Sequence, residues 1–245
     1  MALCAATLAL GGPASADDAE PPDTPHRPVA ELWSGAEAYR RAWSVYGGAT
    51  LALFGSIQED GWRLRALGGQ STYLYRSQRW TGTGTVPVTL QGTATFADLL
   101  VGYHRQLGPL TLKAFAGVST SDHNLDDPEA RVRGRAWGGK GALEAWWNIT
   151  DLAWVSADLS LATMHRDYAS RLRLGWRLLP ELSVGLEAGA VGNLDCDIAR
   201  AGGFLRYAWD GGEASLSGGW ASDAIRGGGD GTPGPYAVLS VLTRF

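Results

Sequence analysis

Apolar and polar residues alternate along successive segments of this chain, from Leu32 to its end. In the segment from Leu182 to Ala190, apolar residues at even positions oppose Ser, Gly and Glu at odd positions. The segments that start at Pro109, Leu152 and Tyr168 alternate in the same way. A period of two places successive side chains on opposite faces of a β-strand. The pattern therefore predicts a sheet with one apolar face and one polar face.

Turn-forming residues divide this pattern into about twelve predicted strands. They start near Leu32, Trp43, Trp62, Leu90, Leu110, Arg135, Leu152, Asp167, Leu182, Ile198, Glu213 and Pro235. Tight turns such as 107–109 and 179–181 alternate with longer predicted loops at 76–89, 121–134 and 222–234. Short turns at one end and long loops at the other are typical of bacterial transmembrane barrels, and an even strand number keeps both termini on one side. We therefore expect an all-β fold, an antiparallel up-and-down transmembrane β-barrel of about twelve strands over residues 31–245.

The polar face of the predicted sheet carries many charged residues. An Arg or Lys facing lipid at the bilayer midplane would cost about 2–4 kcal/mol, so we expect this face to line the lumen. The predicted lumen residues are Arg63, Arg65, Asp98, Lys113, Lys140, Glu144, Asp158, Arg171, Arg173, Arg177, Glu187, Arg200, Arg206 and Glu213, with Glu37 beside them. Two interpretations stay open. The charges form salt bridges that stabilise the barrel, or they line a hydrophilic path for a polar solute.

Tryptophan is frequent, with 11 residues in the chain. A belt of aromatic side chains at the membrane interface is typical of transmembrane barrels. We expect such a girdle to contain Trp33, Trp62, Trp146, Trp147, Trp154, Trp176, Trp209 and Trp220. The alternative is that these residues anchor the core of a soluble β domain.

Composition excludes several other classes of protein. The chain has 245 residues and 34 Gly, which argues against a mostly helical fold because Gly destabilises helix interiors. No run of eighteen apolar residues is present, so the sequence predicts no transmembrane helix. A net charge of −4 gives no basic surface for nucleic acid, and we expect no nucleic-acid partner.

The two ends of the chain suggest export. Residues 1–16 have a short apolar stretch and the sequence Ala14-Ser15-Ala16, typical of a signal peptide with its cleavage site. We expect the acidic, Pro-rich residues 17–30 to form an unstructured tail. The C-terminal segment ends on Phe245 after apolar residues at alternate positions, and it resembles the closing strand of Gram-negative outer-membrane barrels. The expected location is the outer membrane, with its lipid as a partner.

Motifs for catalysis or metal binding are weak. The acidic run at 122–127 lacks the Gly and the bidentate Glu of a calcium-binding EF-hand loop, and the four His show no zinc spacing. His104 and His165 are candidate bases for a hydrolase of the outer-membrane phospholipase type, but no Ser stands in a distinctive motif beside either. We expect both to be solvated at strand ends. The sequence thus predicts no catalytic residue, no metal and no cofactor, and a protein that is not an enzyme.

Several short Gly and aromatic patterns resemble the alphaproteobacterial cellulose biosynthesis proteins of the BcsS family. These patterns are Trp33-Ser-Gly-Ala-Glu37, Tyr46-Gly-Gly-Ala49, Leu100-Val-Gly-Tyr103, Phe115-Ala-Gly-Val118, Arg131-Val-Arg-Gly134 and Gly185-Leu-Glu-Ala-Gly189, continuing through Gly192 and Asn193 to Arg200 and Gly203. Together they extend over most of residues 31–245. The resemblance implies an outer-membrane β protein that helps to make, export or anchor a β-glucan, and it supplies no catalytic residue.

The expected function is that of an outer-membrane barrel auxiliary to cellulose or exopolysaccharide biosynthesis, as an export channel or a surface anchor. Its expected partners are β-glucan or the cellulose-synthesis machinery. The alternatives are a general small-solute porin, a barrel hydrolase of the phospholipase type, or a soluble secreted β domain.

Overall fold

The computed structural model describes residues 27–125, 130–222, 224–225 and 233–245. The predicted signal peptide and residues 17–26 of the predicted tail lie outside these ranges. Near the end of that tail, the backbone N–H of Val29 donates to the carbonyl of Phe245 at 2.5 Å. The carbonyl of Pro28 accepts from the N–H of Ile57 at 2.7 Å, and Ala30 already belongs to the first strand. The sheet therefore begins within the last residues that were assigned to the tail.

Thirteen strands and one short 3₁₀ turn make up the described part of the chain. The strands are β1 (Ala30–Tyr39), β2 (Ala42–Ala52), β3 (Gly61–Trp80), β4 (Thr85–Leu107), β5 (Leu110–Leu125), β6 (Gly134–Asn148), β7 (Ala153–Ala162), β8 (Tyr168–Arg177), β9 (Leu182–Gly192), β10 (Cys196–Trp209), β11 (Gly212–Ala221), β12 (Ala224–Ile225) and β13 (Gly234–Arg244). The turn η1 (Met164–Arg166) connects β7 to β8. Strand β12 has only two residues and pairs with the start of β10.

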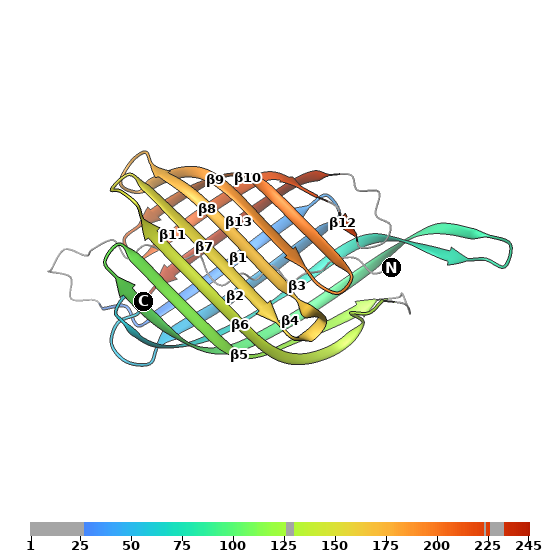
Figure 1. Ribbon diagram of the computed structural model, residues 1–245, viewed down its shortest axis with the longest axis horizontal. Coiled ribbons are helices and arrows are strands. Elements are labelled where there is room, and N and C mark those ends of the chain that lie inside the picture. Colours follow the sequence, from blue (N-terminus) through green and yellow to red (C-terminus); the bar gives the residue numbers. More distant parts are fainter. Residues whose placement is uncertain (1–26, 126–129, 223, 226–232) are drawn as a thin grey trace.

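The other twelve strands close into a barrel (Figure 1). Consecutive strands pair antiparallel from β1 to β11, β11 pairs with β13, and β13 pairs with β1. Closure leaves no barrel strand with a free edge at membrane depth, which a bilayer requires because lipid cannot satisfy backbone hydrogen bonds. The predicted all-β, antiparallel, twelve-stranded barrel is confirmed.

Burial alternates along the strands, but here the apolar side chains are exposed and the polar ones are buried, which is the reverse of a soluble protein. Leu99, Leu143, Leu186 and Leu216 are exposed on the outer face, while charged and hydroxyl side chains between such residues are buried. Strand β13 follows a strict alternation of buried and exposed positions over nine residues. An apolar exterior around a polar interior is the arrangement of a transmembrane barrel. The soluble β domain is therefore not the fold of this chain.

Eleven of the twelve barrel strands start within two residues of the predicted position, and β4 is the exception. It starts at Thr85 rather than near Leu90, and β3 continues to Trp80. The long loop predicted at 76–89 is thus mostly a continuation of the hairpin. Thr and Val favour strands, and the turn is closed by the Thr81 N–H donating to the carbonyl of Gly84 at 2.9 Å. The prediction failed because residues 76–79 are polar at every position, and because Pro87 interrupts the short apolar alternation of Val86, Val88 and Leu90.

The extended hairpin leaves the barrel wall. Tyr73 pairs with Ala42 at the start of β2, and Gly92 pairs with Leu125 at the end of β5. Beyond the Tyr73–Gly92 pair, the described residues of β3 and β4 form a ladder only with each other, although the N–H of Leu74 still donates to the carbonyl of Arg41 at 2.8 Å. We call residues 74–91 the ribbon. Figure 1 shows that it projects well past the other strands at the end of the barrel that carries the longer loops.

Candidate functional site in the barrel interior

The interior holds most of the charged side chains that the sequence assigned to the lumen. Twelve of the fourteen are buried, while Lys140 and Arg177 are partly buried. Glu37 is buried with them, and so is Glu31 of β1, which the sequence analysis did not include. Glu31 was missed because the predicted strand started one residue after it. Its position on the same face as Trp33 follows from the alternation along β1.

Most of these charges are paired. Strand neighbours form the pairs Arg171–Asp158 at 2.8 Å, Arg173–Glu187 at 2.7 Å and Arg206–Glu213 at 2.6 Å. Two of these pairs lie directly opposite one another: Asp158 faces Arg171 in the β7–β8 ladder, and Glu187 faces Arg173 in the β8–β9 ladder. Arg206 and Glu213 are diagonal neighbours, because Glu213 lies opposite Ala208. A buried charge without a partner is costly, so pairing is what permits this interior.

Other pairs cross the lumen between strands that are not neighbours. The Arg65 guanidinium of β3 contacts the Glu144 carboxylate of β6 through both of its terminal nitrogens, one of them at 3.3 Å. Lys113 of β5 approaches Glu31 of β1 at 3.8 Å. Arg200 of β10 lies 3.6 Å from Glu37 of β1. These contacts join walls three or four strands apart and occupy the middle of the barrel.

Aromatic rings fill much of the remaining interior. The rings of Trp146 and Trp154 stack with centroids 4.0 Å apart, and Phe204 packs on Trp154 at 5.4 Å. The Arg206 guanidinium lies 5.1 Å from the Trp146 ring, and that of Arg65 lies 3.7 Å from the Phe115 ring. Cation–π contacts of this kind are stronger when they are desolvated. The interior is thus a packed layer of guanidinium groups and rings.

These rings correct part of the predicted aromatic girdle. Trp33, Trp146 and Trp154 are buried inside the barrel, with at most 4% of their surface exposed. Trp62, Trp147, Trp176, Trp209 and Trp220 do face outward, as expected of an interfacial belt. All eight lie toward the ends of predicted strands, which suggested a common belt. The alternation along β1, β6 and β7, however, assigns Trp33, Trp146 and Trp154 to the polar face.

The loop between β2 and β3 folds over the short-turn end of the lumen. Ile57 of this loop is 2% exposed, and the buried Arg63 guanidinium donates to the carbonyls of Ser56 at 3.2 Å and Ile57 at 3.0 Å. His104 contacts the same Arg63 nitrogen through its Nδ1 at 3.1 Å. The expectation of a solvated His104 is therefore wrong. Its ring is fully buried and points into the barrel, because His104 shares the inward face of β4 with Leu100 and Asp98.

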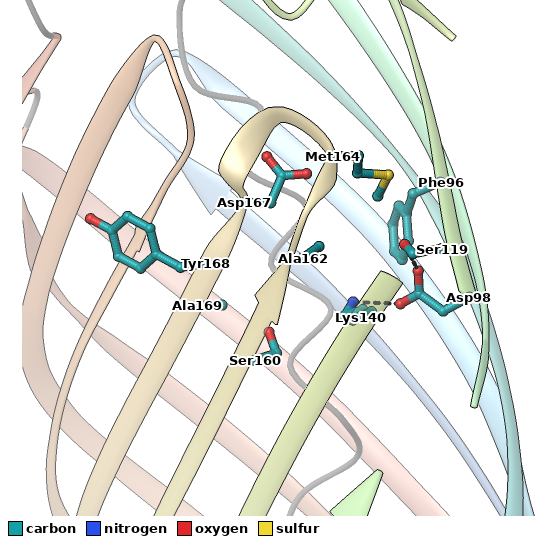
Figure 2. A pocket seen from close by; sticks show the side chains of 10 residues that line it. All are labelled: Phe96, Asp98, Ser119, Lys140, Ser160, Ala162, Met164, Asp167, Tyr168 and Ala169. Carbon is teal, nitrogen blue, oxygen red and sulfur yellow. Dashed lines mark hydrogen bonds and ion pairs between the residues drawn. The ribbon is translucent and has the colours of Figure 1, made fainter. Parts of the chain in front are cut away.

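A small polar pocket lies under η1 at the opposite end. Figure 2 shows Lys140 bonded to the Asp98 carboxylate, which also accepts the Ser119 hydroxyl proton. Asp167 extends from the connection between η1 and β8 toward this pocket, and its buried Oδ1 has no hydrogen-bond partner. Burial raises the pKa of Asp167 to about 7, against the opposing effect of Lys140. This carboxyl is therefore poised to change charge near neutral pH.

His165, the second candidate base, lies within η1 and has a positive φ of 46°. Its ring packs edge-on against that of His123, with centroids 5.2 Å apart. Burial lowers the pKa of His165, so the ring is neutral at pH 7. The residue as a whole is partly buried, and its Nε2 is enclosed. The expected solvated position therefore holds only for part of the side chain. Neither histidine is presented on the outer face, where a phospholipase-type site would need it.

Within the described ranges, no group of three or more His, Cys, Asp or Glu side chains is arranged to hold a metal ion. The same residues include no helix of the length and apolar character needed to cross a membrane.

A closed antiparallel barrel with an apolar exterior and a charged, packed interior defines the class: an outer-membrane β-barrel protein. Solved structures of this fold include the KdgM porin in complex with disordered oligogalacturonate, with 10% identity and a TM-score of 0.50 over 88% of this chain and 99% of that one. A TodX monoaromatic hydrocarbon channel mutant aligns with 11% identity and a TM-score of 0.51, over 90% of this chain and 91% of its own. At such identities the likeness is one of fold.

The sequence profile described as cellulose biosynthesis protein BcsS matches residues 31–245. The chain belongs to this family, and the predicted resemblance is confirmed. No curated protein shows significant sequence similarity to the chain. The family associates the barrel with cellulose biosynthesis.

Proposed function

We propose that this protein is a non-enzymatic anchor that holds newly made cellulose, or a related β-glucan, at the surface of a Gram-negative cell. It acts from the outer membrane after removal of residues 1–16. Its family supports the link to cellulose, and its fold supports the location. Long loops of such barrels face outward, so the ribbon end is the one that would meet the polymer.

The packed interior is the observation that favours an anchor over an export channel. The cross-lumen pairs Arg65–Glu144 and Lys113–Glu31 lie on the path that a polymer would take. Separating the partners of a buried ion pair costs about 3–5 kcal/mol when one charge is left uncompensated. The stacked Trp146 and Trp154 add a second obstruction. A glucan chain crossing the barrel would have to displace all of these contacts.

A strain that lacks the gene tests the proposal directly. We expect it to make cellulose at the normal rate but to release more of it into the medium, with less cellulose-dependent dye bound to the cells. Complementation by the intact gene is the control. Normal retention of cellulose at the cell surface would contradict the anchor.

Conductance of the purified protein in planar bilayers distinguishes the alternatives. We expect no steady ion conductance. A stable current that cello-oligosaccharides block would support the export channel instead. A current without such block, together with swelling of liposomes in sugars of graded size, would support a general porin.

A further inference from the structure

The base of the ribbon contacts the barrel, because the N–H of Leu74 donates to the carbonyl of Arg41 at 2.8 Å and Leu90 packs against the cluster of Tyr73, Ala94 and Leu125. Beyond this base, the two ribbon strands pair with no third strand among the described residues. The register of the ribbon runs from the Leu74–Gln91 pair to the Trp80–Thr85 pair, so each strand contributes about seven residues beyond the barrel. At roughly 3.3 Å per residue, it extends about 23 Å past the last barrel pairs. An isolated hairpin is at best marginally stable in water. A projection of this length is expected to contact something outside the protein.

The ribbon's edges are poorly suited to bind another protein strand. Pro87 lies within β4 and has no backbone N–H, and Arg76 and Arg79 lie on β3. Proline and charged residues on an exposed edge are the usual means of preventing strand addition. The two faces of the ribbon are therefore the more suitable surface for a ligand.

The composition of the ribbon indicates the chemistry of that ligand. No acidic residue occurs between Asp60 and Asp98, and Arg76 and Arg79 are the charged residues of the segment 74–91. The exposed side chains that the structure describes there include an aromatic ring and several hydroxyl and amide groups: Trp80, Thr81, Thr83, Thr89 and Gln91. Hydroxyls and amides both donate and accept hydrogen bonds, as a surface facing many sugar hydroxyls requires.

Trp80 stands at the tip with 69% of its surface exposed. The turn beside it is closed twice, because the N–H and the hydroxyl of Thr81 both donate to the Gly84 carbonyl at 2.9 Å. Gly82, with a φ of 87°, adopts the left-handed conformation that this turn needs. Trp80 is thus a large ring exposed to solvent at the end of β3, next to a closed turn.

We propose that the ribbon is the glucan-binding surface of the protein, with the indole of Trp80 stacked on the flat face of a sugar ring. The ligand is an uncharged, β-linked glucan, whose extended chain offers apolar C–H faces and hydroxyl edges. Trp contributes a large amphipathic surface that matches such faces. This inference rests on the proposed anchor function and assigns its contact with the polymer to residues 74–91.

The experiment uses the purified full chain in detergent. Calorimetric titration with cellohexaose and co-sedimentation with amorphous cellulose measure binding, and maltohexaose serves as the ligand control because it has the same sugar with α-linkages. We expect Trp80→Ala to weaken both cellohexaose binding and co-sedimentation by at least about tenfold, as loss of an aromatic stacking contact commonly does. Trp80→Phe should restore part of the binding.

Trp137 supplies the matched control. It has the same exposed fraction, 69%, but lies on the barrel wall in β6. We expect Trp137→Ala to bind cellulose as the unmodified protein does. We expect maltohexaose to bind much more weakly than cellohexaose. Failure of the unmodified protein to bind cellohexaose and amorphous cellulose, equal binding of maltohexaose, or equal losses in the two variants would overturn the proposal. Binding to vesicles of anionic lipid that depends on Trp80, without glucan binding, would overturn it in favour of a lipid surface.

The two proposals fail in different ways. A deletion strain that releases its cellulose while the purified protein ignores cellohexaose would leave the anchor function in place and remove the ribbon from it. If the purified protein binds glucan tightly through Trp80 but the deletion strain retains its cellulose normally, the ribbon remains a glucan-binding surface and the anchor function is removed.

Discussion

Strands β3 and β4 run through both the barrel body and the ribbon, but their side chains have different surroundings in the two regions. Below the Tyr73–Gly92 pair, β3 and β4 have neighbours on both sides, and Arg63 and Arg65 are buried in the interior. Above that pair, Leu90 still packs against the buried cluster of Tyr73, Ala94 and Leu125, but the tip of the hairpin encloses no interior. Leu74 and Trp80 are exposed above the pair without any lipid-facing wall around them. Stability therefore depends on the barrel body, and the ribbon is free to be selected for contacts with a ligand.

The barrel interior also shows how a charged core is tolerated. Each guanidinium of the central layer has a carboxylate, a ring or both: Arg65 has Glu144 and Phe115, and Arg206 has Glu213 and Trp146. Removing one member of such a set leaves the other buried and uncompensated. If stability depends on the barrel body alone, substitutions in the body lower the free energy of unfolding strongly, and changes in the ribbon hardly lower it.

The largest effect is expected for Glu144→Ala. Arg65 would keep its hydrogen bond to the Thr50 hydroxyl at 3.0 Å but lose the salt bridge that it forms with Glu144 across the lumen. We expect the free energy of unfolding to fall by about 3–5 kcal/mol. Urea unfolding in detergent or lipid measures it. Glu181→Ala, at an exposed turn position, is the control, and an equal loss in both variants would contradict the role assigned to the pair.

A smaller loss is expected for Gly175→Ala in β8. An added Cβ would overlap the ring of Trp154, which packs directly against this glycine. Overpacking of this kind costs about 1–3 kcal/mol because the stacked Trp146 and Trp154 would have to move. Gly141→Ala is the matched control, since its added Cβ would meet only the Phe115 carbonyl at 3.9 Å. Thermal unfolding of both variants, compared in one detergent, tests the difference.

Asp167 introduces a pH dependence at the ribbon end of the barrel. Its pKa is about 7 in the folded protein against an ordinary value of 3.8, so the folded state binds the proton more tightly than the unfolded state. Stability is therefore expected to fall as the pH rises from about 4 through 7, by about 1 kcal/mol or more. Asp167→Asn should remove this fall and be the more stable protein at pH 8. Unfolding curves at pH 5 and pH 8 check it; an unchanged pH dependence in Asp167→Asn would show that another group is responsible.

The sequence predicts the barrel well because its physical cause is local. A side-chain period of two needs only neighbouring residues, so the inward positions of Arg171 and Arg173 follow from the residues between them. The partners of these charges depend on register and closure, which decide that Arg65 meets Glu144 across the lumen. Nothing near either residue indicates that contact.

Two wrong predictions show what local sequence patterns cannot indicate. His104 was expected in solvent because it lies near a strand end, but the β2–β3 loop folds over that end and covers it. Most of the ribbon was expected to be a loop because residues 76–79 are polar at every position and because Gly82, Gly84 and Pro87 are typical of turns. Both errors concern segments whose environment is set by the shape of the whole barrel.

The smallest effect on stability is expected for removal of the outer part of the ribbon, residues 76–89. This variant tests the comparison between barrel body and ribbon most directly. In this variant residues 76–89 are replaced by Asn-Gly, which joins the paired Tyr75 and Leu90 through a tight turn. Leu90 is kept because it packs against the buried cluster of Tyr73, Ala94 and Leu125. We expect the free energy of unfolding to change by less than about 0.5 kcal/mol, as for surface substitutions, while glucan co-sedimentation is lost. A large loss of stability would mean that the ribbon belongs to the folding unit of the barrel, and the separation between a structural body and a binding projection would not hold.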